Sequence, residues 1–180
     1  MEYIKVIFLD VDGEFTYSGY DNRDTADIDI NKVLLLKEIV ENTRAKIVLS
    51  SSWRGFIENG KHRRPKIYQT LVSILSEYGL SIYDDLPEII PIVTDTKKAS
   101  SLTMEEMFDI EIDPTTGRAA EVHNWLSNNP DVENFVILDD ENWKWNYYGY
   151  EKYWIRPSYF DINGGLLKEH VIKAINILNN

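Results

Sequence analysis

Apolar positions along the chain fall into short continuous runs that alternate with longer stretches of helical spacing. The first run, residues 3–9, is almost entirely apolar and rich in β-branched side chains, as expected of a strand buried on both faces at the centre of a sheet. Val33, Leu36 and Val40 then recur at helical spacing, and residues 45–49 form a second apolar run. Strand, helix and strand in this order predict a parallel unit and an α/β fold.

The rest of the chain continues this alternation less regularly. Three more helices are expected from the helical spacing of apolar residues, at 71–78, 118–126 and 167–178. Residues 135–138 predict another buried strand, whereas the Pro-containing residues 88–93 predict a sheet edge or a loop. Thr103 and Glu106 suggest the capping box of a short helix.

Composition and charge narrow the class of protein. The 180 residues are 43% hydrophobic and 27% charged, which is ordinary for a globular chain, so we expect a single domain over residues 1–180. The chain has no cysteine, no signal peptide and no apolar run near the roughly 20 residues of a membrane span, which favours a cytoplasmic protein without a membrane partner. The net charge of −11 disfavours a general grip on nucleic acid, and it requires a cation wherever phosphate is bound.

Carboxylates and hydroxyls follow three of the predicted strands. Asp10 and Asp12 come after the first, the serines 50–52 after the second, and Asp139 and Asp140 after the third. Because ligands of parallel sheets bind at the carboxyl ends of the strands, we expect these side chains in one crevice.

The Asp10 and Asp12 pair suits phosphate chemistry. Residues two apart on an extended segment face the same side, about 6.5 to 7 Å apart, which leaves room for a metal ion or a phosphoryl group. Mg²⁺ prefers hard oxygen ligands, and Asp140 would supply a third carboxylate. One carboxylate can attack phosphorus while a second transfers protons.

These motifs resemble the haloacid dehalogenase (HAD) superfamily of Mg²⁺-dependent phosphohydrolases. The superfamily motifs are, in chain order, residues 10–13, 47–50, a basic residue that opens a helix, and 136–140. Residues 50–54, 117–126 and 165–166 are similar, more narrowly, to the small HAD domain found in Swiss Army Knife RNA repair proteins. The resemblance implies a HAD-like Rossmannoid three-layer sandwich with a central parallel sheet. The short intervals between the motifs leave no room for a large cap domain.

The resemblance also implies roles for the acidic residues. Asp10 would be the nucleophile and a metal ligand. Asp12 would be the general acid and base, with its backbone carbonyl on the metal. Asp140 would complete the Mg²⁺ site, and Asp139 would be a supporting or alternate ligand.

Hydroxyl and basic residues complete the implied site. Ser50 would hydrogen-bond the transferring phosphoryl group, with Ser51 as the alternative one residue away. Arg118, at a predicted helix start, is favoured for the basic role usually held by lysine, and Lys98 is the alternative. Arg54 follows the serines and is a candidate phosphate contact, because guanidinium binds phosphate in a bidentate manner.

Three features bear on the substrate. Glu14 stands where the superfamily commonly has a small or apolar residue. A solvated turn is the favoured interpretation, and the alternatives are repulsion of anionic substrates and assistance to the metal. The basic residues 61–66 are favoured as a solvated loop, with contact to a nucleotide backbone as the alternative. The aromatic stretch 143–154 is expected to close one edge of the core, with one or two rings walling the substrate site.

Together these features predict a Mg²⁺-dependent phosphatase that forms an aspartyl-phosphate on Asp10. Its substrate would be a phosphorylated molecule, and an open site without a cap favours a polynucleotide end or a nucleotide. The alternative is a catalytically weak module of the same fold that binds phosphate or nucleic acid.

Overall fold

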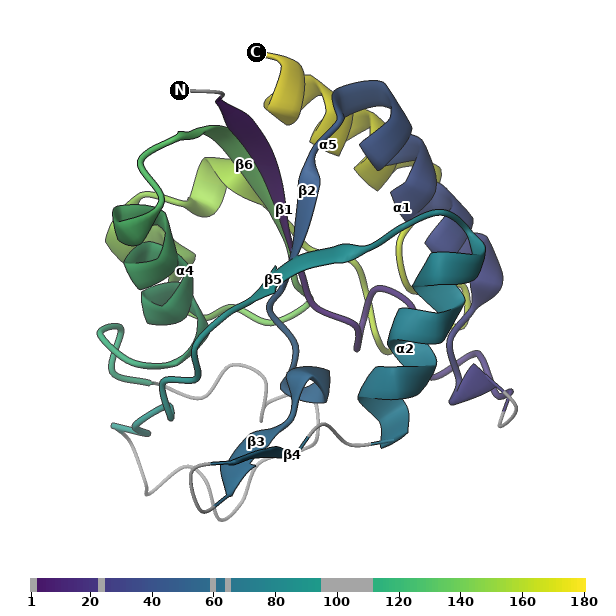
Figure 1. Ribbon diagram of the computed structural model, residues 1–180, viewed down its shortest axis with the longest axis horizontal. Helices are drawn as coiled ribbons and strands as arrows, with labels where there is room; N and C mark the ends of the chain where they lie inside the picture. Colours follow the sequence, from purple (N-terminus) through teal and green to yellow (C-terminus); the bar gives the residue numbers. More distant parts are fainter. Residues whose placement is uncertain (1–2, 23–24, 59–60, 64–65, 95–111) are drawn as a thin grey trace.

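A five-stranded sheet runs through the middle of the molecule in the order β5-β2-β1-β6-β7 (Figure 1). The computed structural model describes residues 3–22, 25–58, 61–63, 66–94 and 112–180. The strands of the sheet are β1 (Ile4–Leu9), β2 (Lys46–Leu49), β5 (Ile82–Asp85), β6 (Val132–Leu138) and β7 (Trp154–Ile155). All neighbouring strands are parallel. The first apolar run therefore forms the central strand, as predicted.

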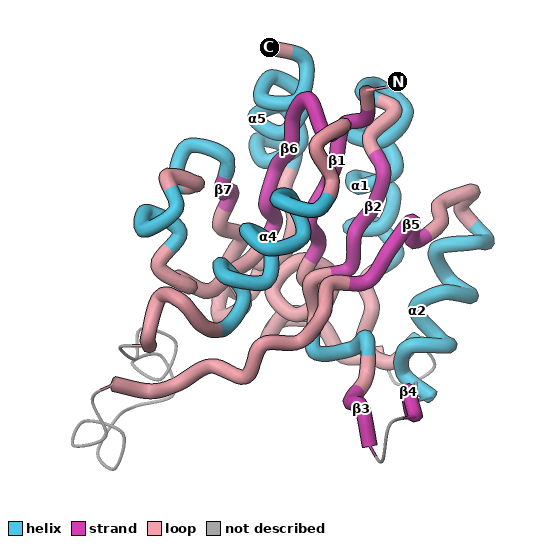
Figure 2. Tube along the Cα trace, turned by 60° about the vertical axis from the view of Figure 1, so that its left-hand side comes forward, coloured by secondary structure: helices cyan, strands magenta, loops and turns pink. Residues whose placement is uncertain are grey.

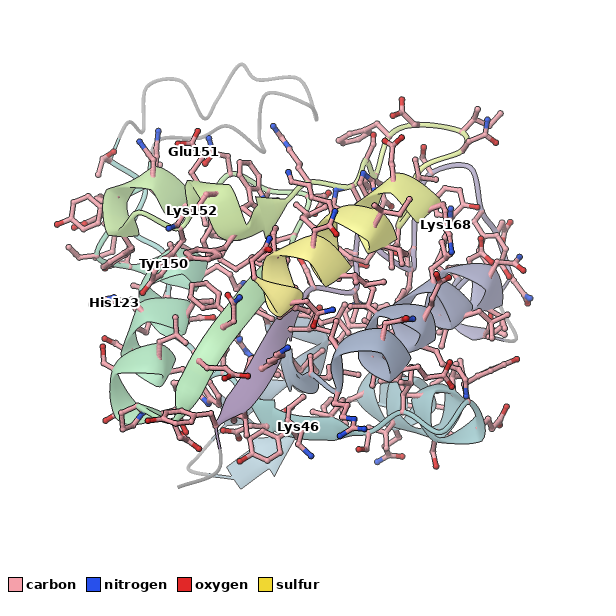
Figure 3. All side chains as sticks on the ribbon, turned by 90° about the horizontal axis from the view of Figure 1, so that it is seen from above. Lys46, His123, Tyr150, Glu151, Lys152 and Lys168 are labelled. Carbon is pink, nitrogen blue, oxygen red and sulfur yellow. The ribbon has the colours of Figure 1, made fainter. Side chains whose placement is uncertain are left out.

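Helices cover both faces of this sheet (Figure 2). The first face carries α1 (Ile30–Thr43), α2 (Lys66–Glu77) and α5 (Lys168–Asn179). The second face carries α4 (Gly117–Asn128) and the short 3₁₀ helices η3 (Trp145–Tyr148) and η4 (Glu151–Tyr153). Seen from the edge where the strands begin, α1 and α5 lie on one side of β1 and β6, and α4 lies on the other (Figure 3). This is the three-layer α/β sandwich that the resemblance implies.

The two faces of β1 explain its continuous apolar sequence. Ile7 and Leu9 are fully buried against α1, α2 and α5, while Val6 and Phe8 are fully buried in the cluster that contains α4 and Trp145. Successive side chains of a strand point to opposite faces, so a strand covered on both sides needs apolar residues at every position.

The four helices predicted within the described residues all form, with ends that differ from the apolar pattern by one to five residues. The strands β5 and β7 were not predicted. The sequence of β5 ends on two acids and the strand has one neighbour, β2, while β7 consists of two residues. Residues 88–93 form a loop. The helix suggested by Thr103 and Glu106 lies outside the described residues.

The connections that follow the strands gather at one edge of the sheet, away from both chain ends (Figure 1). After β2 the chain forms the 3₁₀ helix η2 (Ser52–Arg54) and the hairpin of β3 (Phe56–Glu58) and β4 (Lys61–Arg63). The described residues of these connections contain no large cap domain. None of the described helices is long and apolar enough to span a membrane.

Candidate active site

Three carboxylates meet where the neighbouring strands β1 and β6 end. One oxygen from each of Asp10, Asp139 and Asp140 lies within 4.8 Å of the other two, and all three side chains are buried. Asp139 Oδ1 accepts hydrogen bonds from the Glu141 backbone N–H at 2.9 Å and from Trp143 Nε1 at 3.2 Å. Asp139 Oδ2 has no hydrogen-bond partner among the described residues. The two hydrogen bonds to Oδ1 hold the Asp139 carboxylate in place, and Oδ2 remains available as a ligand. Such a group of hard oxygen atoms fits a divalent cation such as Mg²⁺.

The pKa shifts of these three carboxylates also indicate a site for a cation. Burial raises the pKa of Asp139 well above its usual range and the pKa of Asp140 to about 8, and the charge of Asp10 adds to both increases. Burial also raises the pKa of Asp10, against the opposing charge of Arg118. The three carboxylates therefore repel one another in a poorly solvated space, and a cation among them would keep them ionised.

Arg118, in the first turn of α4, brings a fixed positive charge to these carboxylates. Burial alone would lower the pKa of Arg118, but the charges of Asp10 and Asp139 outweigh burial and raise it. Its guanidinium carbon lies 5.5 Å from the centre of the Trp143 ring. Its Nη1 is buried and, within the described part of the chain, has no acceptor. Lys98, the alternative for the basic role, lies outside the described residues.

Sequence reasoning missed Glu121, a buried acid that pairs with two arginines, Arg54 and Arg118. Arg54 Nη2 donates to both Glu121 oxygens, at 2.9 and 2.8 Å, and Arg118 Nε lies 3.9 Å from Oε2. The backbone N–H of Ile89 donates to Oε1 at 2.8 Å. The i,i+3 spacing from Arg118 on a predicted helix was the available signal. Arg54 is itself buried, and its Nη1 lacks a partner among the described side chains and backbone.

The three serines after β2 occupy different positions around the site. Ser50 is fully buried, and its Oγ has no hydrogen-bond partner in the described ranges. The side chain of Ser51 hydrogen-bonds Asp10 and also caps η2 by accepting from the backbone N–H of Trp53 at 3.3 Å. Ser52, which was expected in the same crevice but was given no role of its own, lines the cleft next to the carboxylates. The phosphate contact of Ser50, with Ser51 as its alternative, stays a prediction.

The turn after β1 fixes the second acid of the pair. Asp12 accepts hydrogen bonds from Thr16 Oγ1 at 2.8 Å and from Trp53 Nε1 at 3.0 Å, one on each oxygen. Gly13 has a φ of +87°, and a Cβ built there would lie 2.4 Å from Cγ of Asp140. Only glycine therefore lets the acids after β1 and β6 approach each other this closely.

Glu14 does not lie where we expected it. The interpretation as a solvated turn residue is wrong, because its side chain is fully buried. Burial raises its pKa well above the usual range, and the charges of Asp10, Asp140 and Asp139 add to the increase. A short loop that returns toward the sheet, with Leu166 N–H donating to the Glu14 carbonyl at 2.9 Å, places this side chain inside the molecule.

A cleft of about 540 Å³ opens at the carboxylates. Its lining combines acids, one serine, one arginine and three aromatic rings: Asp10, Asp12, Asp140, Glu141, Ser52, Arg118, Trp143, Tyr159 and Phe160. A larger hollow of about 750 Å³ lies between α2 and the start of β5, lined mostly by apolar and small polar side chains. The chemistry of the charged groups assigns the site to the smaller cleft.

The aromatic stretch 143–154 divides between core and cleft. Trp145 is fully buried against β1 and α4, which confirms that part of the stretch closes the core, while Trp143 lines the cleft. On the outer side of α4, His123 Nδ1 lies 2.9 Å from the hydroxyl of Tyr150 (Figure 3). Of the basic cluster at residues 61–66, Lys66 is exposed, and the side chains of residues 61–65 lie outside the described part of the structure.

Comparison with known proteins places the chain in a family. No curated protein and no solved structure matches it. The family model described as the HAD domain in Swiss Army Knife RNA repair proteins matches residues 6–171. The match runs from β1 into α5 and includes Asp10, Arg118, Asp139 and Asp140. The chain therefore belongs to the family of HAD domains found in Swiss Army Knife RNA repair proteins.

Proposed function

We propose that the chain is a Mg²⁺-dependent phosphomonoesterase that acts through phosphorylation of Asp10. The observation that carries the proposal is the grouping of Asp10, Asp139 and Asp140 beside the buried cation of Arg118, at the floor of a cleft. Membership of a HAD family supports a hydrolase.

The residues present fit a magnesium ion. Asp10, Asp139 and Asp140 would hold it, together with the backbone carbonyl of Asp12. When bound, the ion supplies positive charge that offsets repulsion between the nucleophile and the phosphate. Asp139 Oδ2 has no hydrogen-bond donor among the described groups, and this supports the placement of the ion.

The reaction would proceed in two balanced steps. An oxygen of the Asp10 carboxylate attacks phosphorus, the bond from phosphorus to the leaving oxygen breaks, and Asp12 donates a proton to that oxygen. A water molecule then loses a proton to Asp12 and attacks the phosphorus, which releases inorganic phosphate and restores Asp10. The hydrogen bonds from Thr16 and Trp53 orient Asp12 for both transfers.

Arg118 and the serines would bind the phosphoryl group. The Nη1 of Arg118, which has no partner within the described residues, is a donor for an oxygen that gains charge in the transition state. Ser52 lines the cleft, and Ser50 and Ser51 are fully buried next to it in the chain. Arg54 would contribute through the acid that it shares with Arg118, namely Glu121.

We further propose that the substrate is a phosphorylated polynucleotide end or a nucleotide. Trp143, Tyr159 and Phe160 line the cleft, and aromatic rings can stack on a nucleobase. The net charge of −11 disfavours a long contact with a nucleic-acid backbone and favours recognition of an end. A cytoplasmic location is consistent with the absence of cysteine from the sequence.

Phosphate release tests the proposal. An aryl phosphate and oligonucleotides with a 3′- or 5′-phosphate are incubated with the protein in Mg²⁺ or in EDTA. We expect release that requires Mg²⁺, is abolished in Asp10→Asn, and is faster for one of the oligonucleotides. Release that survives in EDTA, or that Asp10→Asn leaves unchanged, would contradict the aspartyl-phosphate mechanism.

One observation favours the alternative, a module that binds phosphate or nucleic acid without efficient turnover. Glu14 adds a buried acid whose pKa is raised by the charges of Asp10 and Asp140, and in its ionised form it opposes an incoming phosphate. Such a module would bind a phosphorylated oligonucleotide with the same affinity in wild type and Asp10→Asn and would release no phosphate.

A further inference from the structure

The Glu14 side chain is buried without a hydrogen-bond partner. Its exposed fraction is 0%, and within the described ranges neither carboxylate oxygen has a donor. Its backbone is fixed, because its N–H donates to the Val11 carbonyl at 3.3 Å and its carbonyl accepts from Leu166 at 2.9 Å. An unpartnered buried carboxylate destabilises a fold unless a ligand completes its contacts.

The surroundings of Glu14 are those of the metal site. Gly13, its neighbour in the chain, lies directly against the side chain of Asp140. The four charges that act most strongly on Glu14 are all carboxylates: Asp10, Asp140, Asp139 and Asp12. The Glu14 side chain therefore faces the acids at the ends of β1 and β6.

The buried lysine on α1 does not neutralise this group. Lys32 Nζ lies 5.1 Å from the centre of the Tyr17 ring. Burial lowers the pKa of Lys32, and Asp29 supplies the opposing charge. Its cation is thus engaged by Tyr17 and Asp29, on the side of the loop next to Gly165.

Glu14 is too far from the other acids to be a direct ligand in this arrangement. The oxygens that lie within 4.8 Å of one another belong, among the described residues, to Asp10, Asp139 and Asp140. Magnesium retains several water molecules when proteins bind it, and those waters need acceptors. Carboxylates just outside the ligands commonly fill that role.

We propose that the Glu14 carboxylate accepts hydrogen bonds from the hydration shell of the Mg²⁺ ion and thereby strengthens binding of the ion. The inference rests on the proposed function, since it needs the ion at Asp10, Asp139 and Asp140. Glu14 then stabilises the loaded site and destabilises the empty one. Replacing it has opposite effects on metal affinity and on the stability of the metal-free protein.

Calorimetric titration with MgCl₂ alone tests the affinity. Glu14→Gln keeps the shape of the side chain and one acceptor oxygen, and we expect it to raise the Kd for Mg²⁺ by about 10- to 100-fold. Glu14→Leu removes both acceptors and raises the Kd further. Glu77→Gln is the matched control: it removes one negative charge at an exposed position at the end of α2, near the opposite edge of the sheet, and leaves the Kd unchanged.

Thermal unfolding in EDTA tests the predicted effect on the stability of the metal-free protein. Glu14→Gln is expected to unfold at a higher temperature than the wild type when no metal is present. A Kd for Glu14→Gln within twofold of the wild type, or a lower unfolding temperature in EDTA, overturns the proposal. A variant that fails to fold overturns it as well, because Glu14 would then be a structural group.

Asp140→Asn separates the inference from the proposed function. If Asp140→Asn abolishes Mg²⁺ binding while Glu14→Gln leaves it intact, the metal site stands and the role of Glu14 is rejected. If the wild type binds no Mg²⁺, both are rejected. If Asp140→Asn abolishes Mg²⁺ binding and Glu14→Gln weakens it, the metal site and the role of Glu14 are both supported.

Discussion

At the scale of single residues, Glu121 organises the positive side of the site. Its carboxylate binds Arg54 through two hydrogen bonds and lies 3.9 Å from Arg118. Removing its charge leaves two neighbouring guanidinium groups without their shared acid, and burial and the charge of Arg118 already lower the pKa of Arg54. We therefore propose that Glu121, which is absent from the described lining of the cleft, positions Arg118.

We expect Glu121→Gln to lower kcat by about tenfold and to change KM less, because Arg118 acts mainly on the transition state. Arg118→Ala should lower kcat by about 10²-fold, and Lys98→Ala should leave it unchanged. Steady-state kinetics of the three variants measure this order. A Glu121→Gln protein with lower thermal stability but a normal kcat would reduce Glu121 to a structural role, and a larger effect of Lys98→Ala would move the basic role there.

Two glycines with similar φ angles allow the cost of a positive φ to be measured separately from the cost of a steric clash with Asp140. Gly13 and Gly149 have φ values of +87° and +74°, but a Cβ at Gly13 would meet Asp140, whereas at Gly149 it would have no described atom within 4 Å. Positive φ costs an L-residue about 1 to 2 kcal/mol. Gly149→Ala is therefore expected to lose about that much stability and to keep its Mg²⁺ affinity.

Gly13→Ala should lose more stability than Gly149→Ala and should also bind Mg²⁺ weakly, because the new methyl group displaces Asp140. Denaturant unfolding and Mg²⁺ titration of the two variants provide the measurement. Equal losses of stability, with normal Mg²⁺ binding in both variants, would show that Asp140 does not depend on the close approach.

At the scale of elements, burial on both faces decided which strands the sequence predicted. The apolar runs of β1 and β6 were recognisable because residues 6–9 and 136–138 are fully buried between the helices on the two faces of the sheet. The strand β5 does not, because its Tyr83 is exposed and its Asp84 accepts a hydrogen bond from Trp125 of α4. Such contacts between distant elements leave no periodic signal in a single sequence.

The same distinction applies to the candidate site. The acids at the ends of β1 and β6 were predictable, because strand ends are recognisable and parallel strands bring them together. The burial of Glu14 was not, because it depends on a contact with Leu166 more than 150 positions later in the chain. The place of Ser52 on the cleft lining, while Ser50 is fully buried, was also unpredictable, since it depends on the turn of η2.

At the scale of the whole molecule, the acid cluster links stability to pH. In the metal-free fold, burial raises the pKa of Asp140 to about 8 and that of Glu141 to about 7, so the folded state holds protons that the unfolded state has released. Stability contributed by these groups is present at acid pH and is lost as pH rises toward 8, by at most about 1.4 kcal/mol per pH unit for each proton.

Thermal unfolding in EDTA between pH 5 and pH 8 should therefore show a falling midpoint, and saturating Mg²⁺ should flatten this dependence. A midpoint in EDTA that rises over the same range would contradict the linkage.

We propose that residues 1–180 form a single domain, and the same melts should then show one cooperative transition. Two separate transitions would reject the single domain.

The two ends of the chain are held together far from the chemistry. Lys5 Nζ, near the start of β1, donates to Asn179 Oδ1, at the end of α5, at 2.9 Å. Both chain ends lie at the edge of the sheet where β1 begins, opposite the edge where it ends (Figure 1). A short peptide linker can therefore join the ends, and new ends can be opened at the exposed Gly149. The architecture thus lends itself to circular permutation, and a reporter protein fused before residue 1 or after residue 180 would be attached at the edge of the sheet where β1 begins.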